Sequence, residues 1–302
     1  MPAVSQTRET RFSYDEAFSR NLGWVTQAEQ LRLKQARICI AGLGGVGGIY
    51  LLTLARLGIG AFTIADFDHF ALANFNRQAG ATMSSLDQPK TDVMLALARD
   101  INPELDIRVF DQGLNAANLE SFVEGADVYL DGLDFFALEI RRHLFALCHR
   151  KGVPATTVAP LGMGAALLNF VPGGMSFDEY FQLEGESEDE QALRFLVGLS
   201  PAMQQMTYLV DPSRVDLEQK RGPSTVIAVQ LCSAIAATQV LKLVLGRGDV
   251  VAAPRGLHFD AFRNRLRRTW RPGGNRNLLQ RLLLGVVKRR LRLKDAGDRI
   301  GR

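Results

Sequence analysis

The chain of 302 residues is poor in the residue types that hold small secreted proteins and metal sites together. It has three cysteines and four histidines, and neither type is spaced as in a disulfide framework or a zinc site. Residues 1–11 are polar, so we expect no signal peptide. The longest uncharged run, 222–241, is interrupted by polar residues and is interpreted as a buried helix, not a membrane span. We therefore expect a cytoplasmic protein without zinc.

Charge is unevenly distributed along the chain. The net charge is +4, but residues 261–302 carry fourteen Lys and Arg against two Asp, which leaves residues 1–260 at net −8. Between residues 278 and 293, Leu and Val alternate in clusters with Arg and Lys, the pattern of a basic amphipathic helix. This tail suits tRNA, an anionic membrane or an acidic protein surface, and it equally suits a solvated helix packed on the domain. We divide the chain into a domain of residues 1–260 and a basic tail of residues 261–302.

A glycine-rich turn between two predicted strands organises the rest of the chain. An apolar strand at 37–41 leads into Gly-Leu-Gly-Gly-Val-Gly-Gly at 42–48, a helical run at 49–57 and a second strand at 61–65 that ends on Asp66. Gly42 permits the tight turn, Gly44 lets backbone N–H groups approach a phosphate, and Gly47 lets the helix pack closely. Asp66 is placed to accept hydrogen bonds from a ribose. These features alone leave NAD, FAD and ATP open.

The residues after Asp66 favour a polyphosphate. Arg77 and Lys90 follow the ribose acid, and two fixed cations suit a triphosphate better than a nicotinamide. Here the sequence resembles the ThiF/MoeB/ubiquitin-activating superfamily of adenylating enzymes. The matching features are the Gly-x-Gly-Gly-x-Gly turn, the Asp-x-Asp pair at 66 and 68, the Asn-x-x-Arg-Gln run at 74–78 and Pro89-Lys90.

The resemblance implies an α/β fold: a Rossmann-like, mainly parallel twisted sheet with helices on both faces, extended by C-terminal strands and a helix. It implies ATP-dependent adenylation of a carboxylate, with release of pyrophosphate. Under it, the catalytic residues are Arg77, Lys90, Asp134 and Asn74. The ATP-binding residues are Gly42, Gly44, Gly45, Gly47, Asp66, Asp68, Gln78 and Arg20. Mg²⁺ would be bound by Asp134 together with ATP.

Two of these assignments have a second interpretation. Asp134 closes an Asp-Gly-Leu-Asp run after a predicted strand at 126–130, at the sheet edge where ligands gather. The superfamily acid is usually followed by Asn, whereas Phe135 follows here, and Asp134 also fits a helix N-cap. Arg20, in a helix predicted over 12–35, stands where the superfamily carries an arginine that often reaches the partner subunit's ATP. The resemblance therefore implies a homodimer, although a solvated helix arginine fits Arg20 equally well.

The segment 175–223 departs from the superfamily pattern. Relatives place zinc-binding Cys-x-x-Cys pairs or a thioester cysteine within or beyond this region, but here no cysteine occurs between Cys148 and Cys232. We interpret both of these cysteines, and Cys39, as core residues. The acidic run 184–190 is expected to be solvated and mobile, in an insertion on the substrate side. Residues 258–260 are predicted to form the last strand.

Three alternatives remain at this point. An NAD(P)-dependent oxidoreductase shares the glycine turn but leaves Arg77 and Lys90 without a role. A non-catalytic scaffold partner would not need them either. A tRNA threonylcarbamoyladenosine dehydratase-like enzyme carries a similar Asn-x-Asn-Arg-Gln run, and a basic tail would serve tRNA. For the adenylating enzyme, the substrate class includes the C-terminus of a small ubiquitin-like or sulfur-carrier protein or peptide.

Overall fold

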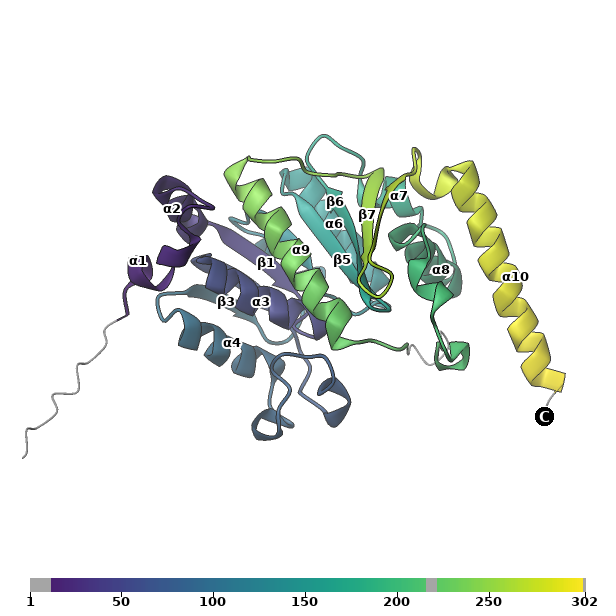
Figure 1. Ribbon diagram of the computed structural model, residues 1–302, viewed down its shortest axis with the longest axis horizontal. Coiled ribbons are helices and arrows are strands. Elements are labelled where there is room, and N and C mark those ends of the chain that lie inside the picture. Colours follow the sequence, from purple (N-terminus) through teal and green to yellow (C-terminus); the bar gives the residue numbers. More distant parts are fainter. Residues whose placement is uncertain (1–11, 216–221, 301–302) are drawn as a thin grey trace, which may run out of the picture.

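One eight-stranded sheet forms the centre of the computed structural model, which describes residues 12–215 and 222–300, with side chains to residue 289 (Figure 1). The strand order is β3-β2-β1-β4-β5-β6-β7-β8. The strands are β1 Arg37–Ala41, β2 Ala61–Ala65, β3 Asp106–Phe110, β4 Val128–Asp131, β5 Ala155–Leu161, β6 Gly164–Phe170, β7 Arg255–Asp260 and β8 Arg265–Trp270. The first five strands are parallel to one another, and β6, β7 and β8 continue the sheet in antiparallel fashion. The predicted mainly parallel sheet with C-terminal strands is therefore confirmed.

Helices cover both faces of the sheet. The α-helices are α1 Tyr14–Ala17, α2 Gln27–Gln35, α3 Gly45–Leu57, α4 Lys90–Ile101, α5 Leu119–Phe122, α6 Leu138–Lys151, α7 Phe177–Phe181, α8 Glu188–Leu199, α9 Val226–Leu245 and α10 Leu278–Ile300. Short 3-10 turns are η1 Ser19–Asn21, η2 Leu72–Asn74, η3 Met83–Ser85, η4 Gln204–Thr207, η5 Pro212–Arg214 and η6 Gly274–Arg276.

The central strand β1 is buried on both sides, as an apolar strand without polar alternation requires. Ile38 and Ile40 belong to the core under α3, α4 and α9, whereas Cys39 and Ala41 face the core under α5, α6, α7 and α8. Because side chains alternate along a strand, β1 joins two cores. The carboxyl ends of β1, β2 and β4 consequently meet at one edge, between two helical layers.

Among the described residues, α9 is the one helix that is long and apolar enough to cross a membrane, judged by length and composition alone. It packs on α3, β5 and β6, and Cys232, Ala236 and Val240 are fully buried. One side of α9 therefore lies in the core, as expected, while Val226 and Ile227 stay exposed.

Three expectations need correction. Residues 12–35 form α1, η1 and α2 instead of one helix, because Leu22 and Val25 form an isolated bridge around Gly23, whose φ is 106°. The strand ending at Asp260 is not the last, since β8 pairs with it. The acidic run 184–190 is largely exposed, as expected, but α8 begins within it at Glu188, so its second half is helical.

Candidate nucleotide-binding site

The glycine turn lies directly against the end of β4. Gly42 has a φ of 83°, and a Cβ built on it would stand 2.3 Å from the carbonyl oxygen of Gly132. A Cβ on Gly47 would stand 1.7 Å from the carbonyl oxygen of Gly42. Only glycine allows these contacts, so the first turn of α3 packs against the strands and points its N-terminus to the sheet edge.

Asp66 ties this turn to the end of β2. Its Oδ2 accepts a hydrogen bond from the backbone N–H of Leu43 (2.6 Å), and its Oδ1 accepts one from the N–H of Asp68 (2.8 Å). The carboxylate is buried. Each oxygen keeps a further acceptor position, so the predicted ribose contact remains chemically available. The contact with Leu43 was not foreseen from the sequence.

Arg77 and Gln78 lie over the same turn. Arg77 Nε is 4.0 Å from a Cβ built on Gly45, and Gln78 Nε2 is 3.7 Å from one built on Gly44. The Arg77 Nη1 group donates to the carbonyl oxygen of Ala73 and to Asn76 Oδ1, both at 2.9 Å. These contacts hold the guanidinium beside the N-terminus of α3.

Gln78 also provides a test of whether a nucleotide fits. Its side chain is buried, and its Oε1 has no hydrogen-bond partner. A buried acceptor without a donor is destabilising by about 1–3 kcal/mol. Ribose hydroxyl and adenine amino groups are donors of the kind that this atom lacks, and Gln78 Nε2, the amide atom near Gly44, can donate to a phosphate or ribose oxygen.

Asn74 and Lys90 already have partners within the chain. Asn74 Oδ1 accepts a hydrogen bond from the N–H of Ala71 (3.0 Å) and so caps η2. The Lys90 ammonium, almost buried, lies 2.9 Å from Asp68 Oδ2. An ammonium has three donors, which leaves two for other groups. Asp68 and Lys90 therefore form a pair at the start of α4.

Asp131 and Asp134 differ in environment. Asp134 is exposed, and its Oδ1 accepts a hydrogen bond from the N–H of Phe136 (3.0 Å). Helix α6 begins at Leu138 with Ala137 as its N-cap, so the alternative of Asp134 as a helix N-cap is wrong. Asp131 is buried against the Arg141 Nε at 2.9 Å.

Arg141 holds the whole segment that carries Asp134. Its Nη2 donates to the carbonyl oxygens of Leu133 (2.9 Å) and Asp134 (3.0 Å), and the Phe195 ring covers the guanidinium at 4.7 Å. The sequence interpretation missed this residue. The signal available was one arginine among the apolar positions that α6 buries.

The start of α9, although distant in the sequence, lies beside the glycine turn. Asn76 Nδ2 donates to the carbonyl oxygen of Ser224 (2.9 Å), and the Thr225 hydroxyl donates to that of Gly162 (2.9 Å). Val229 also approaches Gly45. The turn between β5 and β6 therefore joins the same edge.

Arg20 lies far from its own chain's turn. Neighbouring residues bind the last turn of α3: the Tyr14 hydroxyl and Asn21 Nδ2 donate to the carbonyl oxygens of Gly58 (2.5 Å) and Leu57 (3.1 Å), respectively. The glycine turn is at the opposite end of this 13-residue helix, about 20 Å away. The structure thus brings together the predicted residues between 42 and 134 but not Arg20.

Comparison with known proteins agrees with this geometry. The sequence pattern of the ThiF family matches residues 18–279. The chain belongs to the ThiF family. It is 32% identical to the tRNA threonylcarbamoyladenosine dehydratase of Haemophilus influenzae, over half of this chain and 57% of that protein. It is 33% identical to the sulfur carrier protein ThiS adenylyltransferase of Escherichia coli, over 47% of this chain and 56% of that protein. The chain thus spans little more than half the length of these relatives.

A solved structure with this fold is MccB of E. coli with ATP. Its TM-score is 0.64 at 18% identity, covering 87% of this chain and 72% of that one. At this identity the likeness concerns the fold alone. The predicted superfamily and fold are both confirmed.

The cysteines of this ThiF-family chain are inert by environment. All three are buried. Burial raises the pKa of Cys39 and of Cys148 to about 12, and it also raises the pKa of Cys232 well above its ordinary value. At neutral pH the thiols stay protonated and therefore weakly nucleophilic. Among the described residues, no three His, Cys, Asp or Glu side chains gather to hold a metal.

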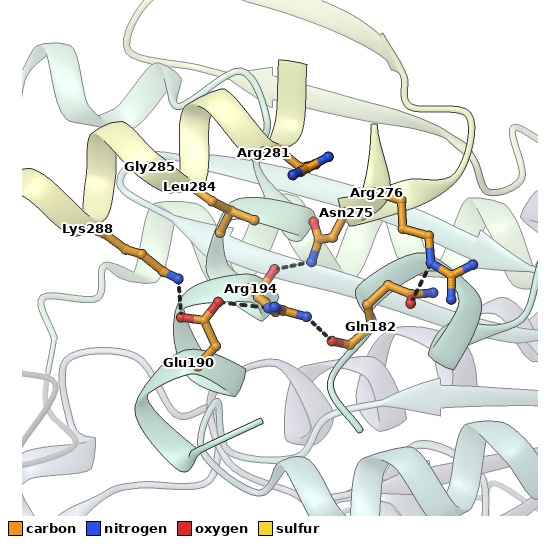
Figure 2. A pocket seen from close by; sticks show the side chains of 9 residues that line it. All are labelled: Gln182, Glu190, Arg194, Asn275, Arg276, Arg281, Leu284, Gly285 and Lys288. Carbon is orange, nitrogen blue, oxygen red and sulfur yellow. Dashed lines mark hydrogen bonds and ion pairs between the residues drawn. The ribbon is translucent and has the colours of Figure 1, made fainter. Parts of the chain in front are cut away.

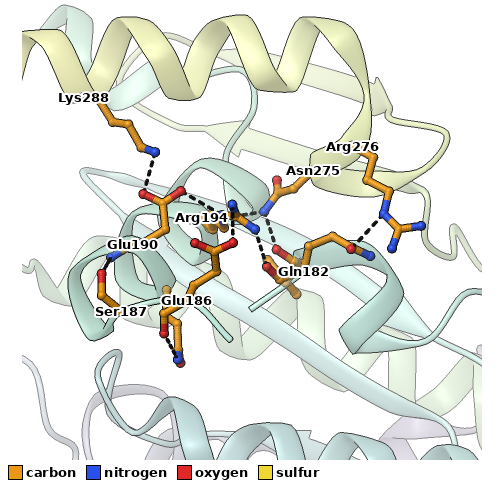
Figure 3. A network of polar contacts seen from close by, with 10 residues as sticks. Gln182, Glu186, Ser187, Glu190, Arg194, Asn275, Arg276 and Lys288 are labelled. Atoms are coloured by element: carbon orange, nitrogen blue, oxygen red, sulfur yellow. Dashed lines mark hydrogen bonds and ion pairs between the residues drawn. The ribbon is translucent and has the colours of Figure 1, made fainter. Parts of the chain in front are cut away.

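A cavity of about 500 Å³ lies elsewhere, between α8, η6 and α10 (Figure 2). Its cations are largely engaged: Arg194 binds Glu190 at 2.8 Å, and Lys288 binds the same carboxylate at 2.7 Å. Glu186 also binds Arg194 (2.7 Å), so two acids of the run 184–190 form ion pairs in this region (Figure 3). Because it lacks the glycine turn, we do not place the nucleotide here.

Proposed function

We propose that this protein is an ATP-dependent adenylyltransferase that activates a carboxylate as an acyl-adenylate. The observation that carries the proposal is the position of Arg77 and Gln78 over Gly44 and Gly45, beside Asp66. This arrangement puts a fixed cation, a buried unpaired acceptor and a helix N-terminus around one turn. The E. coli relative is itself named an adenylyltransferase.

The reaction needs charge neutralisation more than a base. A carboxylate oxygen attacks the α-phosphorus of ATP, and the bond from that phosphorus to the bridging oxygen breaks, so that pyrophosphate leaves with the electron pair. Arg77 would stabilise charge on the transferring phosphate. Lys90 would neutralise the triphosphate with its two remaining donors. Asp66 would hold the ribose, and Asn74 would position a phosphate or the attacking carboxylate through its amide nitrogen.

Asp134 suits Mg²⁺ bound together with ATP. Mg²⁺ is commonly held by one or two carboxylates, with phosphates and water completing the coordination. Asp134 is one exposed carboxylate at the sheet edge, and Arg141 fixes its backbone. Bound there, Mg²⁺ would supply neutralisation of the leaving pyrophosphate.

The carboxylate we favour is the C-terminus of a small carrier protein or peptide. The ThiS adenylyltransferase relative supports this class, since its name specifies a sulfur carrier protein. A tRNA threonylcarbamoyladenosine dehydratase-like activity is the second candidate, favoured by the H. influenzae relative and by the basic tail.

ATP–pyrophosphate exchange tests the proposal. Wild-type protein should catalyse exchange with a carrier C-terminal peptide, and Arg77→Ala should reduce exchange by about a hundredfold or more while ATP binding persists. Lys90→Ala should weaken both pyrophosphate exchange and ATP binding. Exchange that needs tRNA instead of a peptide would select the second candidate. Binding of NAD with no response to ATP in calorimetry would refute adenylation.

We also propose a homodimer in which Arg20 serves the neighbouring site. The distance along α3 excludes Arg20 from its own turn, and α9 leaves Val226 and Ile227 half exposed beside the site. Light scattering should give twice the chain mass. In a mixture of Arg20→Ala and Arg77→Ala proteins, exchange should recover through hybrid dimers. A monomer that retains full activity would contradict the proposal.

A further inference from the structure

Helix α10 has two apolar sides, and only one of them is packed. Leu284 is buried against Leu193 and Val197 of α8, and Gln280 is buried beside it. The other side exposes Leu278 by 73%, Leu279 by 62%, Leu282 by 68% and Val286 by 48%. Residues four apart lie on one helix face, so 278, 282 and 286 form a continuous stripe. We call these four residues the outer stripe.

The packed side is fixed by polar contacts as well as by leucine. Gln280 Nε2 donates to the carbonyl oxygen of Val197 (2.8 Å), and Gln280 Oε1 accepts from Arg271 Nε (3.1 Å). About two turns further on, Lys288 binds Glu190 at 2.7 Å (Figure 3). Rotating the helix to bury the outer stripe would break all three contacts and leave Gln280 without partners. The outward position of the stripe is therefore built into the fold.

Cations border the outer stripe. Arg281 and Arg289 are both exposed, and within the described residues neither side chain makes a hydrogen bond or ion pair (Figure 2 shows Arg281). The sequence of α10 continues with Arg290, Arg292 and Lys294. A helix with an exposed leucine stripe between arginines has the pattern of one that lies in a membrane interface.

We propose that the outer stripe of α10 docks this protein on an anionic lipid bilayer. The leucines would enter the boundary between headgroups and acyl chains, and the flanking arginines would bind lipid phosphates. An RNA backbone would leave the leucines in water. A second copy of α10 would bring two strongly basic helices together, which like charges oppose. The proposal does not depend on adenylation.

Vesicle flotation with the full-length protein tests this docking. The protein should float with vesicles of phosphatidylcholine mixed with phosphatidylglycerol, and weakly or not at all with phosphatidylcholine alone. A Leu278→Glu, Leu282→Glu double variant should lower the partition coefficient by at least about tenfold. The matched control is Leu31→Glu, which alters another exposed leucine (48%), on α2, and should bind like wild type.

Both altered leucines are exposed, so the double variant should keep the wild-type melting temperature and ATP binding. An Arg281→Gln, Arg289→Gln variant should lose its preference for the anionic vesicles. Failure of the wild type to float with them, or a double variant that floats equally well, would overturn the proposal. Two other results would also overturn it. In one, the wild type does not bind vesicles but forms a dimer that the double substitution dissociates. In the other, the wild type does not bind vesicles but binds tRNA, and the double substitution abolishes that binding.

Discussion

Residues 37–134 are joined through backbone in close contact, whereas α8 and α10 are joined through side chains. Of these, Leu284 and Gln280 are buried, but the ion pairs of Glu190 stay partly exposed. In the first region, a glycine allows the start of α3 to touch the turn before it, and a buried Asp131–Arg141 pair locks the neighbouring segment. In the second, Glu190 binds Arg194 and Lys288 at the rim of a cavity. Substitutions should therefore have large effects at the backbone contacts and the buried pair of the first region. They should have small effects at the exposed ion pairs of the second region, where water can replace the lost partner.

Gly47→Ala should have the largest effect. Its methyl group would stand 1.7 Å from the Gly42 carbonyl oxygen, so the turn or the helix must move. We expect a loss of at least about 3 kcal/mol in the free energy of unfolding, measured with urea, together with loss of ATP binding. Near-native stability would show that backbone contact does not hold this region.

Arg141→Met comes next in size. It leaves the Asp131 carboxylate buried without its partner, which destabilises by about 3–5 kcal/mol in comparable pairs. Arg142→Met is the matched control, because Arg142 pairs with the half-exposed Asp178 and should lose about 1 kcal/mol or less. Equal losses in the two variants would remove the distinction between a buried and a surface pair.

Lys288→Met should cost about 1 kcal/mol or less, because the ammonium remains partly in water. The pair also predicts a pH dependence. Burial raises the pKa of Glu190, but Lys288 and Arg194 outweigh it and hold that pKa below 4.5. A depressed carboxyl pKa stabilises the fold above its unfolded value, and this contribution is lost as pH falls from about 4.5 downward. Acid unfolding curves of the variant should show a smaller loss over that range than wild type.

Gly285→Ala should have the smallest effect, with the opposite sign. No atom lies within 4 Å of a Cβ built there, and the residue is inside α10. Alanine should therefore stabilise the helix by up to about 1 kcal/mol, measured by thermal unfolding. A marked loss would mean that α10 is packed more tightly than its exposed side indicates.

The local sequence was sufficient to predict an element wherever the residues of one short stretch determine its structure. The strands at 37–41 and 61–65 were predicted to the residue, because each is a short apolar run with a clear end, at the glycine turn and at Asp66, respectively. The helix expected in the uncharged run 222–241 is α9, Val226–Leu245. The sequence also predicted that Asp66, Arg77 and Gln78 belong to one site, because all three follow the glycine turn within a short stretch of chain.

Long-range packing decided what one stretch could not. The sequence does not reveal that Arg141 donates a hydrogen bond to the carbonyl oxygen of Asp134, because this contact depends on the direction in which α6 leaves the loop after residue 134. It also does not show that Glu190 meets Lys288, 98 positions later, or which side of α10 faces α8. The amphipathic pattern determined that a basic helix forms. Only the buried contacts of Gln280 and Leu284 decided which leucines remain in water.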